Sequence, residues 1–290
     1  MTDVSLVGNT PFIKLSDKLY AKFEAYNPSG SIKDRMASYI LARAIKDGSV
    51  RKGTTIVEAS SGNTGIAFAR LAAKHGYGCI IVMPRNMSSE RKQMMTAYGA
   101  RIIEVGDNAF KDAIKTREEL VNNFGTYWSP RQFENPLNIE CHAETTAREI
   151  AFEVLSIPNR LSALVTGAGT GGTIMGCQSY LSKLWSDAKF LLVQPAESAL
   201  CHGIQGINDG ADFLVDKRLI DEQLVVTTEQ AKLRSEALAK DMGLLVGISS
   251  GANVLAAERW IEENNPTGVV VTFLCDRGER YLSAQRAMEA

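Results

Sequence analysis

The 290-residue sequence predicts an α/β fold of mostly parallel sheets with helices on both faces. Short apolar runs rich in β-branched residues alternate with helical patterns along most of the chain, which is typical of βαβ units. The runs are continuously apolar, and this favours strands that are buried on both faces. With 45% hydrophobic and 22% charged residues, the chain can bury a sizeable core in one or two domains.

The expected elements follow from this alternation. Strands are predicted at residues 54–57, 79–83, 101–105, 163–166, 190–194 and 268–274. Helices are predicted at residues 31–47, 65–75, 89–99, 108–124, 143–155, 228–242 and 253–264. Turn-rich segments at 27–30 and 134–138 are the candidate boundaries of an inserted module.

Composition favours a cytoplasmic protein that acts on a small molecule. The formal charge of -1 provides no net field that would concentrate nucleic acid or an anionic membrane. The segment Met1–Val4 starts no signal sequence, and no run reaches the about 18 apolar residues of a membrane span.

The cysteines predict neither a zinc site nor a disulfide framework. No CxxC pair occurs, and no cysteine has metal-ligand spacing to His75, His142 or His202. The five cysteines are Cys79, Cys141, Cys177, Cys201 and Cys275. Cys79 and Cys275 lie in apolar runs and are interpreted as small buried hydrophobes.

The most specific motif is the segment Asn27–Arg35, NPSGSIKDR. It predicts a turn that leads into a helix, with Ser31 as N-cap and Asp34 at the acidic position of a capping box. Lys33 then lies in the first helical turn, where the helix dipole disfavours a charged amine. An amine that is also desolvated becomes a nucleophile toward an aldehyde. A single lysine is most often a solvated surface residue, so this interpretation depends on the accompanying motifs.

The second motif, Ser60–Gly65 (SSGNTG), joins a predicted strand to a predicted helix. Small residues at such a junction let backbone N–H groups approach a ligand, and a helix N-terminus binds anions such as a carboxylate. A plain turn is the alternative, but it does not explain why hydroxyl and amide side chains gather here.

The third motif, Thr166–Thr173 (TGAGTGGT), contains G-x-G-x-x-G beginning at Gly167, a pattern found in dinucleotide sites. Such sites also have an acidic residue at the end of the next strand, whereas here Asp187 precedes that strand and Glu197 follows late. The two threonines inside the loop suit a compact phosphate monoester. A phosphate site is therefore favoured over a pyrophosphate site.

A fourth loop, Gly247–Asn253, opens a helix that runs through Glu263. By itself it predicts only a helix cap. Its meaning depends on the other three motifs.

Taken in order, these segments resemble the cysteine synthase branch of the fold-type II pyridoxal-phosphate enzymes, which are tryptophan synthase β-like, and within it cysteine synthase B most closely. The resemblance runs nearly from end to end. It rests on residues 7–11, 27–35, 60–65, 83–84, 87–91, 98–100, 132–136, 169–173, 247–251 and 275–283.

The resemblance implies two domains with pyridoxal 5'-phosphate between them. Residues 1–30 and 139–290 would form a large cofactor-binding domain, and residues 31–138 a smaller mobile domain that closes over the substrate. Lys33 would carry the cofactor as a Schiff base. The other implied cofactor ligands are Asn63 at the ring oxygen, Gly169, Thr170, Gly171, Gly172 and Thr173 at the phosphate, and Ser249 at the pyridine nitrogen. The implied substrate carboxylate site is Ser60, Ser61, Gly62, Asn63 and Thr64, with Gln132 beside it.

The implied reaction is β-replacement. O-acetyl-L-serine and sulfide or thiosulfate would give L-cysteine and acetate through an aminoacrylate, with the Lys33 amine taking the Cα proton. A serine opposite the pyridine nitrogen leaves the ring a weaker electron sink than a carboxylate would, which favours loss of a β leaving group. Relatives are generally homodimers, and some are clasped by the C-terminus of serine acetyltransferase.

Three departures from the relatives leave alternatives open. Ser60 stands where threonine is common, and Ala109–Asp112 stands where many relatives have Gly-Met-x-Gly near the sulfur-donor site. The phosphate loop is more similar to the A type, while residues 275–283 are more similar to the B type. Alternatives on this scaffold are a cystathionine β-synthase-like, an O-phosphoserine-using or a diaminopropionate-forming enzyme, whereas Thr64 argues against a serine dehydratase. A dinucleotide-dependent oxidoreductase and a purely binding role are the alternatives from other classes.

Overall fold

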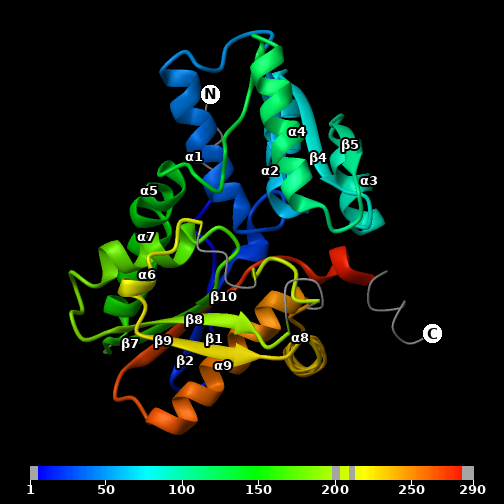
Figure 1. Ribbon diagram of the computed structural model, residues 1–290. Helices are drawn as coiled ribbons and strands as arrows, with labels where there is room; N and C mark the ends of the chain where they lie inside the picture. Colours follow the sequence, from blue (N-terminus) through cyan, green and yellow to red (C-terminus); the bar gives the residue numbers. More distant parts are fainter. Residues whose placement is uncertain (1–5, 158, 198–202, 209–212, 283–290) are drawn as a thin grey trace. The chain divides into compact units, whose positions relative to one another are not determined.

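The computed structural model describes residues 6–157, 159–197, 203–208 and 213–282, and it divides the chain into two units (Figure 1). The first unit comprises Asn27–Asn135 with Met1–Val7 and Glu279–Ala290; the second comprises Gly8–Tyr26 and Pro136–Gly278. Of the residues discussed above, Met1–Val4, Cys201, His202 and Ser283 lie outside the described part. The bounds of the large cofactor-binding domain and of the smaller mobile domain stay a prediction.

A four-stranded parallel sheet in the order β5-β4-β3-β6 organises the first unit. The strands are β3 (Thr55–Ala59), β4 (Gly78–Pro84), β5 (Arg101–Val105) and β6 (Tyr127–Trp128). The helices are α1 (Lys33–Lys46), α2 (Asn63–His75), α3 (Ser89–Ala97) and α4 (Phe110–Asn123). Helix α4 packs on one face of the sheet, and α2 packs on the other with α1 and α3 beside it.

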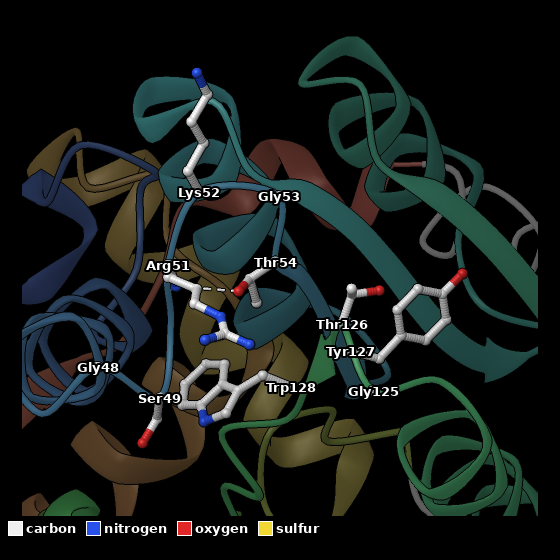
Figure 2. A pocket seen from close by; sticks show the side chains of 10 residues that line it. All are labelled: Gly48, Ser49, Arg51, Lys52, Gly53, Thr54, Gly125, Thr126, Tyr127 and Trp128. Atoms are coloured by element: carbon white, nitrogen blue, oxygen red, sulfur yellow. Dashed lines mark hydrogen bonds between the residues drawn. The ribbon is translucent and has the colours of Figure 1, made fainter.

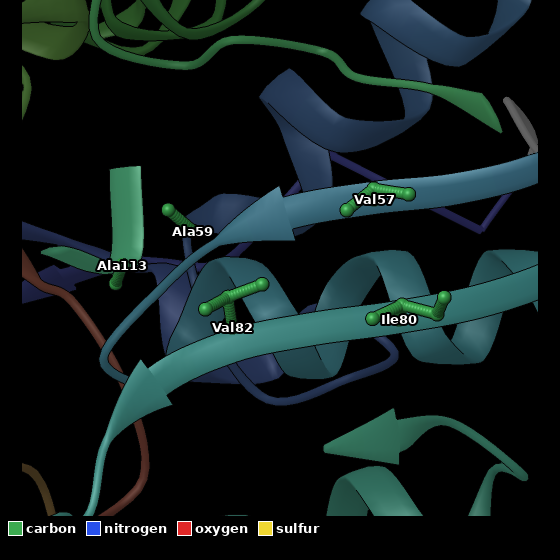
Figure 3. Close-up of a cluster of buried hydrophobic side chains, with 5 residues drawn as sticks. All are labelled: Val57, Ala59, Ile80, Val82 and Ala113. Atoms are coloured by element: carbon green, nitrogen blue, oxygen red, sulfur yellow. The ribbon is translucent and has the colours of Figure 1, made fainter. Parts of the chain in front are cut away.

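Side-chain alternation along β3 and β4 builds the core beneath α4. Val57 and Ala59 on β3 lie beside Ile80 and Val82 on β4, and Ala113 of α4 packs against them (Figure 3). Successive strand residues point to opposite faces, and Ile81, between Ile80 and Val82 on β4, lies against Gly65 of α2. Both faces are therefore covered, as continuously apolar strands require.

The second unit is organised by a six-stranded sheet in the order β1-β2-β10-β7-β8-β9, parallel except for β1. Its strands are β1 (Phe12–Lys14), β2 (Leu19–Phe23), β7 (Leu161–Gly167), β8 (Lys189–Pro195), β9 (Glu222–Val226) and β10 (Val269–Leu274). Its helices are α5 (Leu137–Glu144), α6 (Thr146–Ser156), α7 (Gly172–Leu181), α8 (Thr228–Met242) and α9 (Ile248–Asn264). Helices α8 and α9 lie over one face, and α5, α6 and α7 lie over the other (Figure 1).

The predicted α/β class with mostly parallel sheets and helices on both faces is confirmed. All six predicted strands are present, and both ends of each lie within two residues of the predicted ends. The prediction missed β1, β6 and β9, which lie at sheet edges, and β2, whose apolar pattern is interrupted by Lys22. The last predicted helix begins at Ile248 instead of residue 253, because the Gly247–Asn253 loop supplies its first turn.

Candidate active site

The predicted carboxylate loop lies at a reversal of strand order in the first unit. From β3 the chain passes through α2 to β4 on one side, while β6 lies on the other side of β3. Loops that leave adjacent strands in opposite directions open a crevice at the carboxyl ends of the strands, where ligands of α/β proteins bind. Here these loops are Ser60–Gly62 after β3 and Ser129–Gln132 after β6. The topology therefore brings two predicted substrate segments together.

Hydrogen bonds within the Ser60 loop set the start of α2. The Ser60 hydroxyl accepts from the backbone N–H groups of Gly62 at 3.2 Å and of Gly65 at 3.0 Å. Asn63 and Thr64 are the first two helical residues, and the N–H groups at these positions have no acceptor within the helix. The arrangement is suited to an anion at this helix end.

Gln132 is joined to this loop by both ends of its amide. Its Oε1 accepts from the Thr64 hydroxyl at 2.7 Å, and its Nε2 donates to the Ala59 carbonyl at 3.0 Å. The side chain is 3% exposed. In this state the amide holds Thr64 in place, a role that the expected position of Gln132 beside the carboxylate did not include.

Lys33 is the first residue of α1 and is half-buried. Its position in the first helical turn is confirmed, but the predicted capping box is wrong. The Asp34 carboxylate accepts from the N–H of Ser29 at 2.7 Å, because Gly30, at φ +81°, turns the backbone ahead of the helix. Ser31 accepts from the Lys33 N–H through its hydroxyl at 3.3 Å, and the N-cap position belongs to Ile32.

Burial raises the pKa of the Asp34 carboxyl, and the Ser29 hydrogen bond, Arg70 and Arg280 act in the opposite direction. Arg70 Nε lies 3.4 Å from the Asp34 carboxylate. The acid next to Lys33 is thus a buried structural group that fixes the preceding turn.

Arg280 links the Lys33 turn to the Ser60–Gly65 loop and was not predicted as a site residue. Its guanidinium donates to Oδ1 of Asn63 and to the carbonyl of Ser29, and the residue is 2% exposed. Because Oδ1 is the acceptor, Nδ2 is the donor end of the Asn63 amide. The signal in the sequence was the segment 275–283, which contributed to the resemblance without a role for any single residue.

The predicted phosphate loop lies at a reversal of strand order in the second unit. Strand β7 has β8 on one side and β10 on the other, and the loop runs from its end to Gly172, the first residue of α7. Gly171 has φ +93°, a conformation that favours glycine. A Cβ at Gly169 would lie 2.8 Å from the Gly206 carbonyl oxygen, so this position also requires a glycine.

Two asparagines that were not predicted as site residues support this loop. Asn138 donates to the Thr170 hydroxyl at 3.0 Å, and Asn208 donates to the Gly169 carbonyl at 2.6 Å. The Thr173 hydroxyl lies 3.3 Å from Nε2 of His142. The loop is therefore held in shape with its N–H groups at the start of α7, which suits a phosphate.

Ser249 occupies the first turn of α9 and is 4% exposed. On the same helix, Oδ1 of Asn253 accepts from the Gly167 N–H at 2.8 Å, and Nδ2 donates to the Phe273 carbonyl at 3.2 Å. This amide ties α9 to the ends of β7 and β10. The predicted site residues thus form one group in the first unit (Lys33, Ser60–Thr64 and Gln132) and one in the second (Gly169–Thr173 and Ser249).

A separate pocket of about 280 Å³ opens at the amino-terminal edge of the first unit's sheet (Figure 2). Its lining residues are Gly48, Ser49, Arg51–Thr54 and Gly125–Trp128. It contains none of the predicted site residues. In the described ranges, no helix is long and apolar enough to cross a membrane, and no cluster of His, Cys, Asp and Glu could hold a metal ion.

Comparison with known proteins places these features in context. The family model for pyridoxal-phosphate dependent enzymes matches residues 5–276. A cysteine synthase of Staphylococcus aureus is 38% identical over 298 residues, which cover 96% of this chain and 94% of that protein. A hydrogen sulfide-producing enzyme from Fusobacterium nucleatum superposes with a TM-score of 0.92 at 37% identity, covering 97% of this chain and 90% of that chain. An O-acetylserine dependent cystathionine β-synthase from Helicobacter pylori superposes with a TM-score of 0.89 at 35% identity, covering 96% of each chain.

Proposed function

The chain belongs to the family of pyridoxal-phosphate dependent enzymes, and from this premise we propose that it makes L-cysteine from O-acetyl-L-serine and sulfide, releasing acetate. Thiosulfate is the alternative sulfur donor, and it would give S-sulfo-L-cysteine and acetate. The cofactor is pyridoxal 5'-phosphate. The observation that carries the proposal is the hydrogen-bonded group of Ser60, Thr64 and Gln132 at a helix N-terminus in the same unit as Lys33. An amino-acid carboxylate and a lysine-bound aldehyde need such a pair of features.

Within each unit, the residues fit the part of the cofactor that they would hold. Gly169–Thr173 would hold its phosphate, because αL Gly171 directs the loop into α7 and a side chain at Gly169 would collide with Gly206. Lys33 would hold its aldehyde carbon, and Ser249 would face its ring nitrogen. Asn63 would donate to its ring oxygen from Nδ2, because Arg280 occupies Oδ1.

When bound, pyridoxal phosphate supplies an electron-withdrawing ring that makes a substrate Cα proton acidic and allows a β-substituent to leave. Lys33, freed from the cofactor, would take that proton and hold it at Nζ. Ser61, Asn63 and Thr64 would orient the substrate carboxylate at the start of α2. Closure over this loop would exclude water from the reacting carbon.

A cystathionine β-synthase-like reaction is the second candidate, since the Helicobacter pylori enzyme uses O-acetylserine and superposes along most of the chain. Phe110 and Asp112 leave the sulfur donor open, because they differ in size and charge from the residues of many relatives near the sulfur-donor site. O-phosphoserine use and diaminopropionate formation are further alternatives on this scaffold.

The substrate pair is tested by turnover. O-acetyl-L-serine and O-phospho-L-serine are each combined with sulfide, thiosulfate, homocysteine and ammonia, and the products are identified by mass spectrometry. The expected outcome is that O-acetyl-L-serine reacts fastest with sulfide, giving cysteine, or with thiosulfate, giving S-sulfo-L-cysteine. Preference for homocysteine would assign the chain to the second candidate.

The role of Lys33 is tested by visible absorption spectroscopy. Purified protein should show the yellow visible band of a lysine-bound cofactor, and Lys33→Ala should lose both this band and turnover while its far-ultraviolet circular dichroism is unchanged. Lys46→Ala, in the last turn of the same helix, is the matched control. Substantial residual turnover in Lys33→Ala would contradict the proposal.

For partners, we propose a homodimer and a site for the C-terminus of serine acetyltransferase. Helix α6 exposes two apolar side chains, Phe152 at 72% and Leu155 at 65%, which a second subunit would cover. Light scattering on the protein and on Phe152→Glu tests the dimer. Competition between an acetyltransferase C-terminal peptide and O-acetyl-L-serine tests the second partner. Among the described residues, Cys79, Cys141, Cys177 and Cys275 form no disulfide, which suits the proposed reducing cytoplasm.

A further inference from the structure

We propose that the buried ion pair between Arg117 and Glu58 is a positioning device for the substrate carboxylate site. It would act through Gln132 on the Thr64 hydroxyl. The inference rests on the proposed function, because it assigns the Ser60–Thr64 loop to a substrate carboxylate. It adds two residues, one on α4 and one on β3, that touch neither cofactor nor substrate.

The pair is fully enclosed in the first unit. Both side chains are 0% exposed, and Arg117 Nη1 lies 3.2 Å from Glu58 Oε1. The carboxylate also accepts from the N–H of Ala59 at 2.7 Å and from the N–H of Gln132 at 3.2 Å. Burial raises the pKa of the Glu58 carboxyl, and Arg117 and the two backbone N–H groups act against that rise.

Stability alone gives little reason for such a pair. Desolvating two charges costs about as much as their attraction returns, and apolar residues of similar volume often serve a core as well. Val57 and Ala59 flank Glu58 on β3, and Ala113 lies one helical turn before Arg117 on α4, so apolar side chains already occupy this part of the unit's core. Apolar residues could not accept the hydrogen bond from the Gln132 N–H, and so they could not fix the position of the Gln132 backbone.

Ion pairs with α4 hold the loop on either side of Gln132, at Arg131 and at Glu134. Arg131 has φ +52°, an uncommon conformation for a residue with a side chain, so this backbone persists only if its surroundings hold it. Arg131 pairs with Glu118 at 2.6 Å, and Arg117 contacts Glu134 at 3.3 Å and also pairs with Glu118. The guanidinium of Arg117 therefore joins β3, α4 and the loop in one charged network.

Gln132 passes this fixed position on to the carboxylate site. Its backbone N–H is held by Glu58, and its side chain accepts from Thr64 and donates to the Ala59 carbonyl. A shift of the Gln132 backbone therefore moves the acceptor that orients the Thr64 hydroxyl. A misplacement of about 1 Å in a positioning group can lower the rate about 100-fold.

The test is Glu58→Gln. The amide keeps the shape of the carboxylate, but its N–H group would face one of the three donors that the carboxylate accepts from, which are the Arg117 guanidinium and the N–H groups of Ala59 and Gln132. We expect the KM for O-acetyl-L-serine to rise about tenfold. The reason is that a hydrogen bond to the charged Glu58 carboxylate is lost, and the contacts of Gln132 with Glu58 and Thr64 carry this loss to the substrate site. The KM for the sulfur donor and the visible band of the bound cofactor should stay within about twofold. Binding of L-serine to the holoenzyme, followed by absorbance, should weaken by the same factor as the KM.

Two further variants complete the test. Glu119→Gln, also on α4 but in an exposed pair with Lys115 at 3.9 Å, is the matched control and should leave both constants unchanged. In a Thr64→Val background the connection is already cut, so adding Glu58→Gln should change L-serine affinity by less than about twofold.

A merely structural pair would give a different pattern. If Glu58→Gln lowers the melting temperature but leaves the O-acetyl-L-serine KM and L-serine affinity within about twofold of wild type, the inference is overturned. If Glu58→Gln does not fold, Glu118→Gln, which releases Arg131, decides: unchanged L-serine affinity overturns the inference and weakened affinity supports it. A wild-type protein that binds L-serine but does not turn over O-acetyl-L-serine would sink the proposed reaction and leave the positioning test intact.

Discussion

Replacing Arg280 by methionine should loosen both halves of the first unit's site at once. The guanidinium holds the Asn63 amide and the Ser29 carbonyl, which belong to segments more than thirty residues apart in sequence. Methionine keeps much of the apolar stem but donates no hydrogen bond. The Asn63 amide and the turn before Lys33 would then lose their common anchor.

The magnitude follows from the two contacts. A hydrogen bond to a charged group contributes about 1.5–3 kcal/mol, and leaving two buried acceptors with one donor fewer each gives a loss of about 3 kcal/mol once non-additivity is allowed for. At roughly 2 °C per kcal/mol for a chain of this size, the melting temperature should fall by about 6 °C. Cofactor affinity should fall as well, since Asn63 is the proposed partner of the ring oxygen.

The pH dependence of this loss has a definite sign. Arg280 is one of the groups that lower the pKa of Asp34, so its removal raises further a pKa that burial already raises. A group whose folded-state pKa is raised stabilises the folded protein at low pH and loses that contribution as pH rises through the folded-state pKa. The penalty of Arg280→Met should therefore be smaller at about pH 5 than at about pH 8.

The assay is thermal unfolding at both pH values, with and without added cofactor, together with titration of the visible band. Arg280→Lys keeps the charge but lacks the planar fork that reaches two acceptors, so an intermediate loss is expected. Arg101→Met, on the exposed edge strand β5, is the control. An Arg280→Met protein with the melting temperature and cofactor affinity of wild type would refute the reasoning.

Three further predictions follow from local geometry. Burial raises the pKa of the Cys79 thiol to about 12. Iodoacetamide at about pH 8 should therefore leave Cys79 unmodified in the native protein and modify it in urea, as measured by peptide mass mapping. Rapid modification of Cys79 in the native protein would contradict this. Gly251→Ala should lower the unfolding free energy in urea by about 1–3 kcal/mol, because its Cβ would lie 2.1 Å from the Ala231 carbonyl oxygen of α8, whereas Gly125→Ala enters open space and should be neutral. Gly171→Ala should weaken cofactor binding, measured by titration of the visible band, because the residue has φ +93° and its Cβ would lie 2.9 Å from the Val215 nitrogen; unchanged affinity would separate this loop from the phosphate.

Strand positions and ligand loops could be predicted because their signals are local. The runs that became β4, β7, β8 and β10 are continuously apolar, and a strand buried on both faces leaves that mark in its own residues. The loops at Ser60 and Gly169 stand between such strands and helical patterns, which places them at strand ends. Strands with polar residues leave a weaker pattern in the sequence. The edge strand β9 is mostly exposed, and β2, between β1 and β10, contains Lys22, whose amine is buried against Glu149 at 2.8 Å.

The contacts between distant polar groups could not be predicted. Thr64 and Gln132 are 68 residues apart, and Arg280 and Asn63 are 217 apart. No periodicity records such a pairing, because each member alone is an ordinary polar residue in a loop or helix.

The amino-acid sequence by itself determined the fold class, the junctions where ligands could bind and the position of Lys33 at a helix start. Strand order decided the rest, since it set which loops share a sheet edge and therefore which buried polar groups had to satisfy one another. The physical reason is that the burial of each strand and helix is reflected in the order of its own apolar and polar residues. A buried hydrogen bond or ion pair, in contrast, exists only once the fold has removed water from both partners.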